Sequence, residues 1–326
     1  MELFIKKIDE TRLGNAAEVG YKNAGLGELY NMAETEMAVP GGFAVTSTAF
    51  SYFLEQNGLY GKLGTLMDEL DSDRFSNLQE IGAKARNLFA NARFPASLEN
   101  AIAQAYARLS AETGDAVAVR SSAYAVGCLP NNFSGQYDTY LNITGPYALM
   151  YAIKCCFASL YNDFAIKYRT HNGIAHNKVL LPVGIQQMVR SDLACSGTGC
   201  TQGLNGTGTV QLWGYWGLGR QASLAGIDTD EFVISGEGAP IQKRLGSKTN
   251  MLVYNDHAAG TNTTTDKTTP RELRAGFVLT DADAAQLARH ARAMERYYRG
   301  KVEFEWAKDG LNNRLCILQA GPVMKK

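Results

Sequence analysis

Residues 302–307, Val-Glu-Phe-Glu-Trp-Ala, predict a β-strand, and residues 314–320 predict the second strand of a hairpin. Successive side chains of a strand point to opposite faces, so Glu303 and Glu305 share one face. Two carboxylates on one face repel each other unless a cation lies between them. Mg²⁺ takes carboxylate oxygens together with nucleotide phosphate oxygens. The pattern, with Gln319 on the neighbouring strand, predicts either a metal-nucleotide site or a solvated acidic edge.

Upstream of this hairpin, helix patterns and β-rich runs share the chain. Thr280 is a good N-cap for a helix over residues 281–298, which has acidic residues in its first turn. Apolar spacing predicts further helices over residues 47–54, 76–92, 98–109 and 147–169. Strands are expected over residues 116–120 and 210–213, and over residues 179–189 on both sides of a Pro-Val-Gly step at residues 182–184. Gly- and Thr-rich residues 196–209 predict a loop or hairpin, and polar residues 256–270 predict a mobile segment.

These elements predict an α/β (α+β) fold with two lobes. The composition shifts near residues 190–205, so we expect an N-terminal lobe over residues 1–195 and a C-terminal lobe over residues 196–326. A chain of 326 residues is long enough for two lobes that each have a core. We expect a nucleotide in a cleft between the lobes.

Bulk properties exclude several classes of protein. Formal net charge is zero, from 32 basic and 32 acidic residues, so a general nucleic-acid or membrane-surface binder is not expected. No apolar stretch is long enough for a signal peptide or a transmembrane helix. The six cysteines form no CxxC pair, which indicates free thiols in a reducing cytoplasm rather than disulfides or a zinc site. Cys155 and Cys156 are expected in the core.

Two cations stand where phosphate chemistry could use them. Lys22 lies at a loop-to-helix junction, where a phosphate also gains from helix N-terminal amides, although a lysine there can simply be solvated. Arg120 directly follows a buried strand and precedes two serines, which suits a phosphate clamp or a structural salt bridge. Residues 184–189 could form a strand on which a purine lies, or only a buried strand.

The chain also carries, in order from residue 20 to residue 322, sequence blocks of one family. Lys-Asn-Ala-x-Leu-Gly-Glu (22–28), Val-Pro-x-Gly-Phe (39–43), Val-Ala-Val-Arg-Ser-Ser-Ala (117–123) and Ser-Gly-Gln (134–136) come first. Ala-Ser-Leu (158–160), Tyr-Arg (168–169), Gln-x-Met-Val (186–189), Ser-Gly (196–197), Trp-Gly-Leu-Gly (216–219), Leu-Gly-x-Lys (245–248), Glu-Trp-Ala (305–307) and Gln-Ala-x-Pro (319–322) follow. In these blocks the chain resembles the ATP-grasp nucleotide-binding domain that opens phosphoenolpyruvate synthase and pyruvate phosphate dikinase.

The resemblance implies an ATP-grasp fold, ATP and Mg²⁺ as cofactors, and a role for each candidate residue. Lys22 and Arg120 would grip phosphates, Glu303 and Glu305 would hold Mg²⁺, Gln319 would support the phosphate end, and Gln186, Met188 and Val189 would border the adenine. In such enzymes the domain transfers the pyrophosphoryl end of ATP to a histidine on a separate swivelling domain. AMP and phosphate are released, and the phosphohistidine delivers its phosphoryl group to an acceptor.

The chain departs from the family pattern at several positions. Gly321 replaces the arginine of the closing Gln-Ala-Arg-Pro, and residues 124–127 replace a Thr-Ala-Glu-Asp that contains an acidic pair. Arg220 stands where the family has a glutamate, and could replace the lost arginine's charge. Three hypotheses therefore stay open: an active kinase half with altered specificity, a weakened enzyme, and a degenerate nucleotide-binding or regulatory relative without catalysis.

The family's histidine and acceptor-binding domains have no counterpart in these residues. His257 is not expected to carry a phosphoryl group, since it lacks the family's glycine-rich context, and His171, His176 and His290 are expected at the surface. We therefore expect a phosphohistidine-carrying domain or subunit in trans, with a small-molecule phosphoryl acceptor on the complex. Phenylphosphate synthase is the family precedent for such a split. A full-length phosphoenolpyruvate synthase is possible only if this chain is a fragment.

Overall fold

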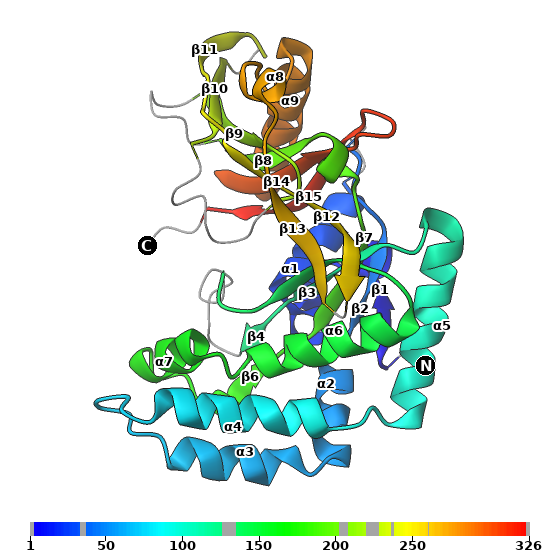
Figure 1. The fold of residues 1–326 in the computed structure, drawn as a ribbon, viewed down its shortest axis with the longest axis vertical. Coiled ribbons are helices and arrows are strands. Elements are labelled where there is room, and N and C mark those ends of the chain that lie inside the picture. Colours follow the sequence, from blue (N-terminus) through cyan, green and yellow to red (C-terminus); the bar gives the residue numbers. More distant parts are fainter. Residues whose placement is uncertain are drawn as a thin grey trace. The chain divides into compact units, whose positions relative to one another are not determined.

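The computed structural model describes residues 3–32, 37–125, 135–201, 208–219, 228–235, 238–259 and 261–323, with only the backbone of residues 256–259. The chain forms two compact units, shown in Figure 1. Unit 1 comprises Met1–Gly27 and Gly41–Gln187, and unit 2 comprises Glu28–Pro40 and Met188–Lys326.

Unit 1 contains a five-stranded antiparallel sheet. Its strand order is β1 (Ile5–Lys7), β2 (Gly42–Val45), β7 (Val183–Gln187), β3 (Val117–Ser121) and β5 (Thr139–Ile143). Phe43, Val119 and Ile185 lie on one face and enter the main hydrophobic core. The strands predicted over residues 116–120 and 179–189 are confirmed, although Leu181 and Pro182 separate β6 (Val179–Leu180) from β7. β6 pairs instead with β4 (Tyr124–Ala125).

Helices build the rest of unit 1, and α6 packs against β3, β5 and β7. The helices of this unit are α1 (Ala16–Tyr30, whose last turns belong to unit 2), α2 (Ser47–Gln56), α3 (Leu59–Asp68), α4 (Leu78–Asn91), α5 (Ala96–Thr113), α6 (Pro146–Ser159) and α7 (Asp163–His171). Short 3₁₀ turns occur at η1 (Ile8–Glu10), η2 (Leu13–Asn15) and η4 (His176–Lys178). The helices predicted over residues 47–54, 76–92 and 98–109 are confirmed.

The single helix predicted over residues 147–169 is wrong, because the chain leaves the helix between α6 and α7. Asn162 is extended (φ −64°, ψ 141°), and its Nδ2 donates to Oδ1 of Asp138 at 2.9 Å. Nη1 of Arg86 donates to the carbonyl of Tyr161 at 2.7 Å and to Oδ1 of Asp163 at 2.9 Å. Contacts with Asp138 and Arg86, which are distant in sequence, thus hold the chain at this break.

Unit 2 contains a six-stranded antiparallel sheet with α9 (Asp281–Tyr298) packed against β10, β14 and β15. Its strand order is β11 (Pro240–Arg244), β10 (Asp230–Ser235), β9 (Thr209–Trp216), β8 (Cys195–Cys200), β14 (Val302–Lys308) and β15 (Leu315–Pro322). The predicted hairpin of β14 and β15 and the predicted strand at residues 210–213 are confirmed. Residues 196–209 supply parts of the antiparallel pair β8 and β9, as the hairpin alternative predicted. The short elements η5 (Ser191–Leu193) and α8 (Arg271–Arg274) complete the unit.

The start of α9 is set by its first residues, as the sequence predicts. Oγ1 of Thr280 accepts from the backbone N–H of Asp283 at 3.1 Å, and Oδ2 of Asp283 accepts from the N–H of Thr280 at 3.1 Å. This capping box satisfies two N–H groups that otherwise have no partner within the helix.

Residues 256–270 differ from the prediction of a mobile polar segment. They contain the strand β13 (Asn262–Thr268), which pairs with β12 (Asn250–Ala259). Polarity suggested a loop, but threonine is β-branched and suits an exposed strand.

Two of the three histidines that were predicted to lie at the surface are at least partly buried. His290 is only 7% exposed, because it lies on the face of α9 that also buries Leu287 and Ala291. His176 is half-buried, whereas His171 is exposed at the end of α7, as expected. The side chain of His257 lies outside the described residues.

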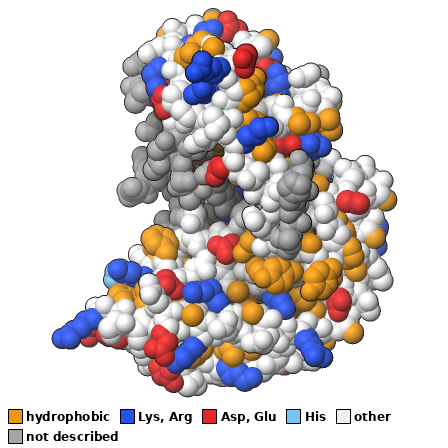
Figure 2. Space-filling view, in the orientation of Figure 1, with side chains coloured by type: hydrophobic (Ala, Val, Ile, Leu, Met, Phe, Trp, Pro, Cys, Tyr) orange, Lys and Arg blue, Asp and Glu red, His pale blue; other side chains and the backbone are white. Residues whose placement is uncertain are grey.

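Cys155, Cys156, Cys195, Cys200 and Cys316 are free thiols, and Cys156 is fully buried, as predicted; Cys155 is only half-buried. Burial raises the pKa of Cys195 to about 12 and that of Cys316 to about 11, so both stay protonated at neutral pH. None of the helices in the described ranges is long and apolar enough to cross a bilayer. Figure 2 shows basic and acidic side chains interspersed on one face, in line with a net charge of zero.

Candidate functional site

The face of the unit 1 sheet that points away from the main core carries two of the predicted site residues. In the register of β3 and β7, Arg120 lies opposite Gly184 and Ala118 lies opposite Gln186. Arg120 and Gln186 therefore share a face. Nη1 of Arg120 donates to Oε1 of Gln186 at 3.4 Å. Gln186 is buried and Arg120 is half-buried, so the sheet holds this guanidinium beside an amide.

Lys22 follows a sharp break in α1. Gly20 has φ +78° and ψ 163°, a conformation that L side chains rarely adopt, so a new helical segment starts after it. Lys22 lies in the first turn of that segment, where backbone N–H groups still lack helical acceptors. This placement matches the loop-to-helix junction expected from the sequence, and the N–H of Tyr21 in this turn donates to the carbonyl of Ala123 at 3.5 Å.

The Lys22 turn docks directly onto the segment that follows Arg120. A Cβ on Gly20 would come within 1.6 Å of the carbonyl oxygen of Ser122, so only glycine fits there. The N–H of Asn23 donates to Oγ of Ser122 at 3.1 Å. A Cβ on Gly184 would come within 2.2 Å of Oδ1 of Asn23, so that side chain lies directly on β7. Three polar segments that are far apart in the sequence therefore meet within unit 1.

The carboxylate pair lies on the hairpin of unit 2. Glu305 pairs with Gln319 and Glu303 pairs with Gly321 across β14 and β15. Because Glu303 and Glu305 are two residues apart on one strand, both carboxylates and Gln319 occupy one face. Glu303 is exposed and Glu305 is half-buried, whereas Val302, Phe304 and Trp306 are buried on the other face. The predicted sharing of a face is thus present in the structure.

This donor set fits a cation that completes its shell with other ligands. No group of three or more His, Cys, Asp or Glu side chains that could hold a metal occurs in the described part of the chain. Mg²⁺ is commonly bound by one or two carboxylates together with water and substrate phosphates. Two carboxylates on one face suit that mode and do not suit a closed structural site. Gly321 leaves open space beside Glu303, since a Cβ there would have no atom within 4 Å.

Met188 and Val189 lie just beyond β7, at the start of the second segment of unit 2. The side chain of Val189 is 7% exposed and packs with Ala38, Ala307 and Cys316 in a small cluster. Met188 is half-buried. Val189 can therefore present only its main chain to a ligand.

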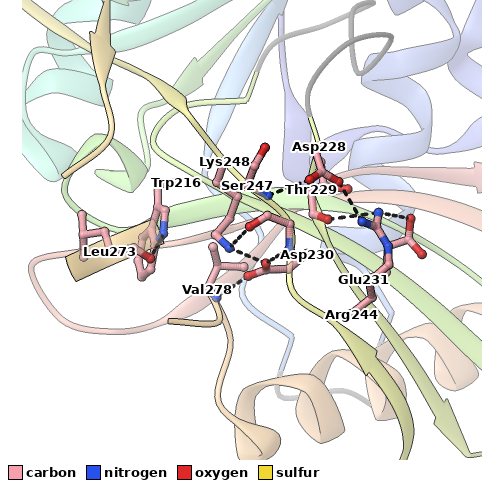
Figure 3. A network of polar contacts seen from close by, with 11 residues as sticks. Trp216, Asp228, Thr229, Asp230, Glu231, Arg244, Ser247, Lys248, Leu273 and Val278 are labelled. Carbon is pink, nitrogen blue, oxygen red and sulfur yellow. Dashed lines mark hydrogen bonds and ion pairs between the residues drawn. The ribbon is translucent and has the colours of Figure 1, made fainter. Parts of the chain in front are cut away.

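A polar network that the sequence did not single out lies in unit 2 (Figure 3). Nζ of Lys248 donates to Oδ1 of Asp230 at 2.5 Å, and both side chains are 0% exposed. Asp230 also accepts from the N–H groups of Gly246 and Val278, each at 2.8 Å. Lys248 appeared above only within a family block, and no local pattern in the sequence indicates its partner 18 residues away.

The outer part of this network is exposed. Arg244 bridges Asp228 at 2.8 Å and Glu231 at 2.7 Å. Its guanidinium, followed by the backbone N–H of Ser247, lowers the pKa of Asp228. Lys248 itself has φ +41° and is fully buried, and its ammonium group already contacts Asp230 and the carbonyl of Gly246. We assign this network to the scaffold of unit 2.

Several positions named from the sequence lie outside the described residues. They are Val126, Gly127, Ser134 and Arg220. Of the departures from the family pattern, Gly321 is described, and so are Tyr124 and Ala125 in β4.

Comparison with known proteins identifies the family. The family model described as "Pyruvate phosphate dikinase, AMP/ATP-binding domain" matches residues 16–326. Phosphoenolpyruvate synthase from Pseudomonas aeruginosa (strain UCBPP-PA14) is 38% identical over 333 residues, covering 99% of this chain and 42% of that protein. Its namesake from Escherichia coli (strain K12) is 38% identical over 326 residues, covering 95% of this chain and 40% of that protein. A probable phosphoenolpyruvate synthase from Methanocaldococcus jannaschii is 30% identical over 324 residues, covering 98% of this chain and 26% of that protein.

The chain belongs to the pyruvate phosphate dikinase AMP/ATP-binding domain family, and its fold is of the ATP-grasp type, as the resemblance implied. It spans about two fifths of the length of the first two relatives.

Proposed function

We propose that this chain, as an ATP-binding domain of the dikinase family, binds Mg-ATP and transfers its pyrophosphoryl group to a histidine on a partner domain or subunit. The main support is that the family match covers residues 16–326, which include every residue of the proposed ligand set. Similarity to phosphoenolpyruvate synthases supports a phosphotransferase.

In this proposal unit 1 supplies the cations that bind the phosphates. The docking of the Gly20 turn onto Ser122 supports this role for Lys22 and Arg120, because it fixes both cations to the same part of one sheet. Phosphoryl transfer depends mainly on positioning and charge neutralisation. Gln186, Met188 and the main chain of Val189 border the adenine.

Unit 2 supplies the metal ligands. Glu303 and Glu305 hold Mg²⁺, and Gln319 supports the phosphate end of the nucleotide. When bound, the metal neutralises phosphate charge and orients the phosphate chain. The shared face of the two glutamates and their pairing with Gly321 and Gln319 support this assignment.

The proposed reaction has two products from the nucleotide. A partner histidine nitrogen attacks the β-phosphorus of ATP, the bond from that phosphorus to the α-phosphate oxygen breaks, and AMP leaves. Water then removes the terminal phosphate from the pyrophosphohistidine, and phosphohistidine passes its phosphoryl group to a small-molecule acceptor. The acceptor could be pyruvate, as in phosphoenolpyruvate synthase, or phenol, as in phenylphosphate synthase.

The test is AMP formation. The chain is mixed with ATP labelled at the α-phosphate, Mg²⁺ and each histidine-carrying protein encoded beside it. We expect AMP only when both proteins are present. Glu305→Gln should slow AMP formation by on the order of 100-fold, because it removes a carboxylate that would hold the Mg²⁺ that neutralises phosphate charge. Glu272→Gln, an exposed glutamate on α8, is the matched control. If no partner yields AMP, the transferase proposal fails.

A second candidate function is a degenerate ATP-grasp domain that binds a nucleotide and regulates without catalysis. The observation that favours it is Gly321, which stands opposite Glu303 where the family pattern has an arginine. Losing one phosphate-contacting arginine costs about 3 kcal/mol of transition-state stabilisation, by analogy with other clamp deletions.

Calorimetry with ATP and Mg²⁺ separates this candidate from an inert scaffold. Sub-millimolar binding that disappears in Lys22→Ala, without AMP formation in the first test, would support a regulatory nucleotide site. Gly321→Arg then restores the family residue, and its side chain meets open space. A gain of AMP formation in that variant would identify Gly321 as the cause of lost activity.

A further inference from the structure

A cavity of about 520 Å³ lies within unit 1, and none of the residues proposed for the nucleotide lines it. It is lined by α2, α3, α7, η4 and β6, which lie in the lower part of Figure 1. Much of its wall is apolar, with Phe50, Leu54, Leu63, Ile174 and Val179 among the lining residues. A space of this size and polarity is typical of a site for a small organic molecule.

Of the two charged side chains in this wall, Asp68 is exposed and Arg169 is buried. Arg169, on α7, lines the cavity and is 0% exposed. Its Nε donates to Nδ1 of His176 at 3.0 Å, and its Nη1 donates to the hydroxyl of Tyr137 at 3.5 Å. The guanidinium carbon lies 5.8 Å from the centre of the Tyr161 ring. Its Nη2 is buried and makes no hydrogen bond to any residue that the structure describes.

The surroundings of Arg169 do not neutralise its charge. Among the described residues, no carboxylate forms an ion pair with it, and Asp68 lines the cavity only as an exposed side chain. Burial, followed by the charge of Arg169, lowers the pKa of His176 to about 4, so that ring is neutral at pH 7. A buried guanidinium with an unused donor is costly unless an acceptor, best an anionic one, completes its contacts.

We propose that this cavity binds a small organic anion, whose oxyanion accepts a hydrogen bond from Nη2 of Arg169 while its apolar body lies against Leu54, Leu63 and Ile174. The oxyanion is a carboxylate or a phosphate, since either accepts from a guanidinium with the same geometry. The apolar walls require a body that an inorganic ion lacks.

Four probes that differ in charge and in apolar body separate the sources of binding. The full chain is titrated with benzoate, phenyl phosphate, inorganic phosphate and the neutral benzamide, and binding is followed by calorimetry and by the NMR signals of His176. We expect saturable binding of benzoate or phenyl phosphate. The one that binds more tightly shows whether the site prefers a carboxylate or a phosphate. Benzamide and inorganic phosphate should bind at least tenfold more weakly, since one lacks the charge and the other the apolar body.

Two glycines on α3 (Leu59–Asp68) give a matched pair of variants. Gly64 lines the cavity, whereas Gly61 does not, and an added Cβ has open space at both positions. Gly64→Trp should weaken benzoate binding at least tenfold by filling the cavity, and Gly61→Trp should leave it unchanged. Arg169→Gln should also weaken it at least tenfold, and the glycine pair keeps the test valid if that variant does not fold.

Three outcomes would overturn the proposal. They are the absence of saturable binding of either organic anion up to 10 mM, equal binding of benzamide and benzoate, and equal benzoate binding by the two tryptophan variants. Each readout is independent of ATP and AMP, so failure of the transferase proposal would leave this result untouched.

Discussion

Each unit contains a fully buried cation, and the two are satisfied in different ways. Lys248 in unit 2 and Arg169 in unit 1 are both 0% exposed. Lys248 contacts the carboxylate of Asp230 at 2.5 Å and the carbonyl of Gly246 at 2.9 Å. Arg169 contacts only neutral groups in the described part of the chain, and its Nη2 makes no hydrogen bond.

This difference in hydrogen-bond and charge partners distinguishes a cation of the scaffold, Lys248, from a cation of a candidate binding site, Arg169. In unit 2 the charge of the ammonium group is paired with a carboxylate of its own unit, and two of its three N–H donors have acceptors there. In unit 1 the positive charge of Arg169 has no carboxylate partner among the described residues, its Nη2 donor has no acceptor there, and its side chain lines a cavity. Lys22 and Arg120 form a third class, since both are half-buried on unit 1, and in the proposed site they would meet a nucleotide phosphate without the full cost of burial.

The largest effect is expected from breaking the satisfied pair. Lys248→Met leaves the Asp230 carboxylate buried without a cation, so the free energy of unfolding of unit 2 should fall by about 3–5 kcal/mol. Tryptophan fluorescence during urea denaturation reports this unit selectively, because Trp213, Trp216 and Trp306 all lie in it.

Lys243→Met is the matched control. Its ammonium contacts Asp281 at 2.7 Å, but the two side chains are 34% and 60% exposed, so the loss should be at most about 1 kcal/mol. Equal losses in the two variants would show that burial does not determine the contribution of an ion pair in this unit.

The next effect concerns the histidine beside the unsatisfied cation. The pKa of His176 is about 4 in the folded chain, below its usual value of 6.5, chiefly because of burial and then because of Arg169. The unfolded chain therefore binds more protons between these values. The contribution of neutral His176 to stability is complete above pH 6.5 and is lost as the pH falls toward 4.

The size of this loss is about 2 kcal/mol, after a discount for solvent around the half-buried ring. Chemical denaturation at pH 6.5 and at pH 4.5, followed by circular dichroism, measures it. His176→Gln cannot take up the proton, so its stability should fall less over the same interval. A variant that loses as much as the parent chain would assign the pH dependence to other groups.

Sequence and structure agree where neighbours in the chain determine the outcome. The capping box at Thr280 and Asp283 and the alternation over residues 302–307 are local patterns, and both elements form as predicted. The break after α6 and the pairing of Lys248 with Asp230 depend on partners distant in the chain. No periodicity over a short window contains them.

In the candidate site, too, the sequence predicts the local features but not the contacts between distant segments. The shared face of Glu303 and Glu305 follows from the period of a strand, so the sequence could predict it. The docking of the Lys22 turn on Ser122 and of Asn23 on Gly184 joins segments about 100 residues or more apart. Family blocks indicated that these segments act together, but only the fold supplies the contact.

A smaller effect is expected from removing the unsatisfied cation. Arg169→Met loses hydrogen bonds to His176 and Tyr137, but it also removes a buried charge that has no carboxylate partner. These terms oppose each other, so the unfolding free energy of unit 1 should change by about 1 kcal/mol. Hydrogen exchange of α7 peptides in urea measures it. A loss as large as that of Lys248→Met would place Arg169 in the scaffold and weaken the case for a ligand at its Nη2.

The smallest effect is expected in the exposed part of the Lys248 network. Arg244 bridges Asp228 and Glu231, but its side chain is 48% exposed, so water and salt screen both contacts. Arg244→Gln should lower the unfolding free energy of unit 2 by about 1 kcal/mol or less, and the loss should shrink further in 0.5 M salt. The same tryptophan signal measures it. If the loss instead matches that of Lys248→Met, the inner pair depends on its exposed neighbour, and the buried and exposed contacts act as one cooperative unit.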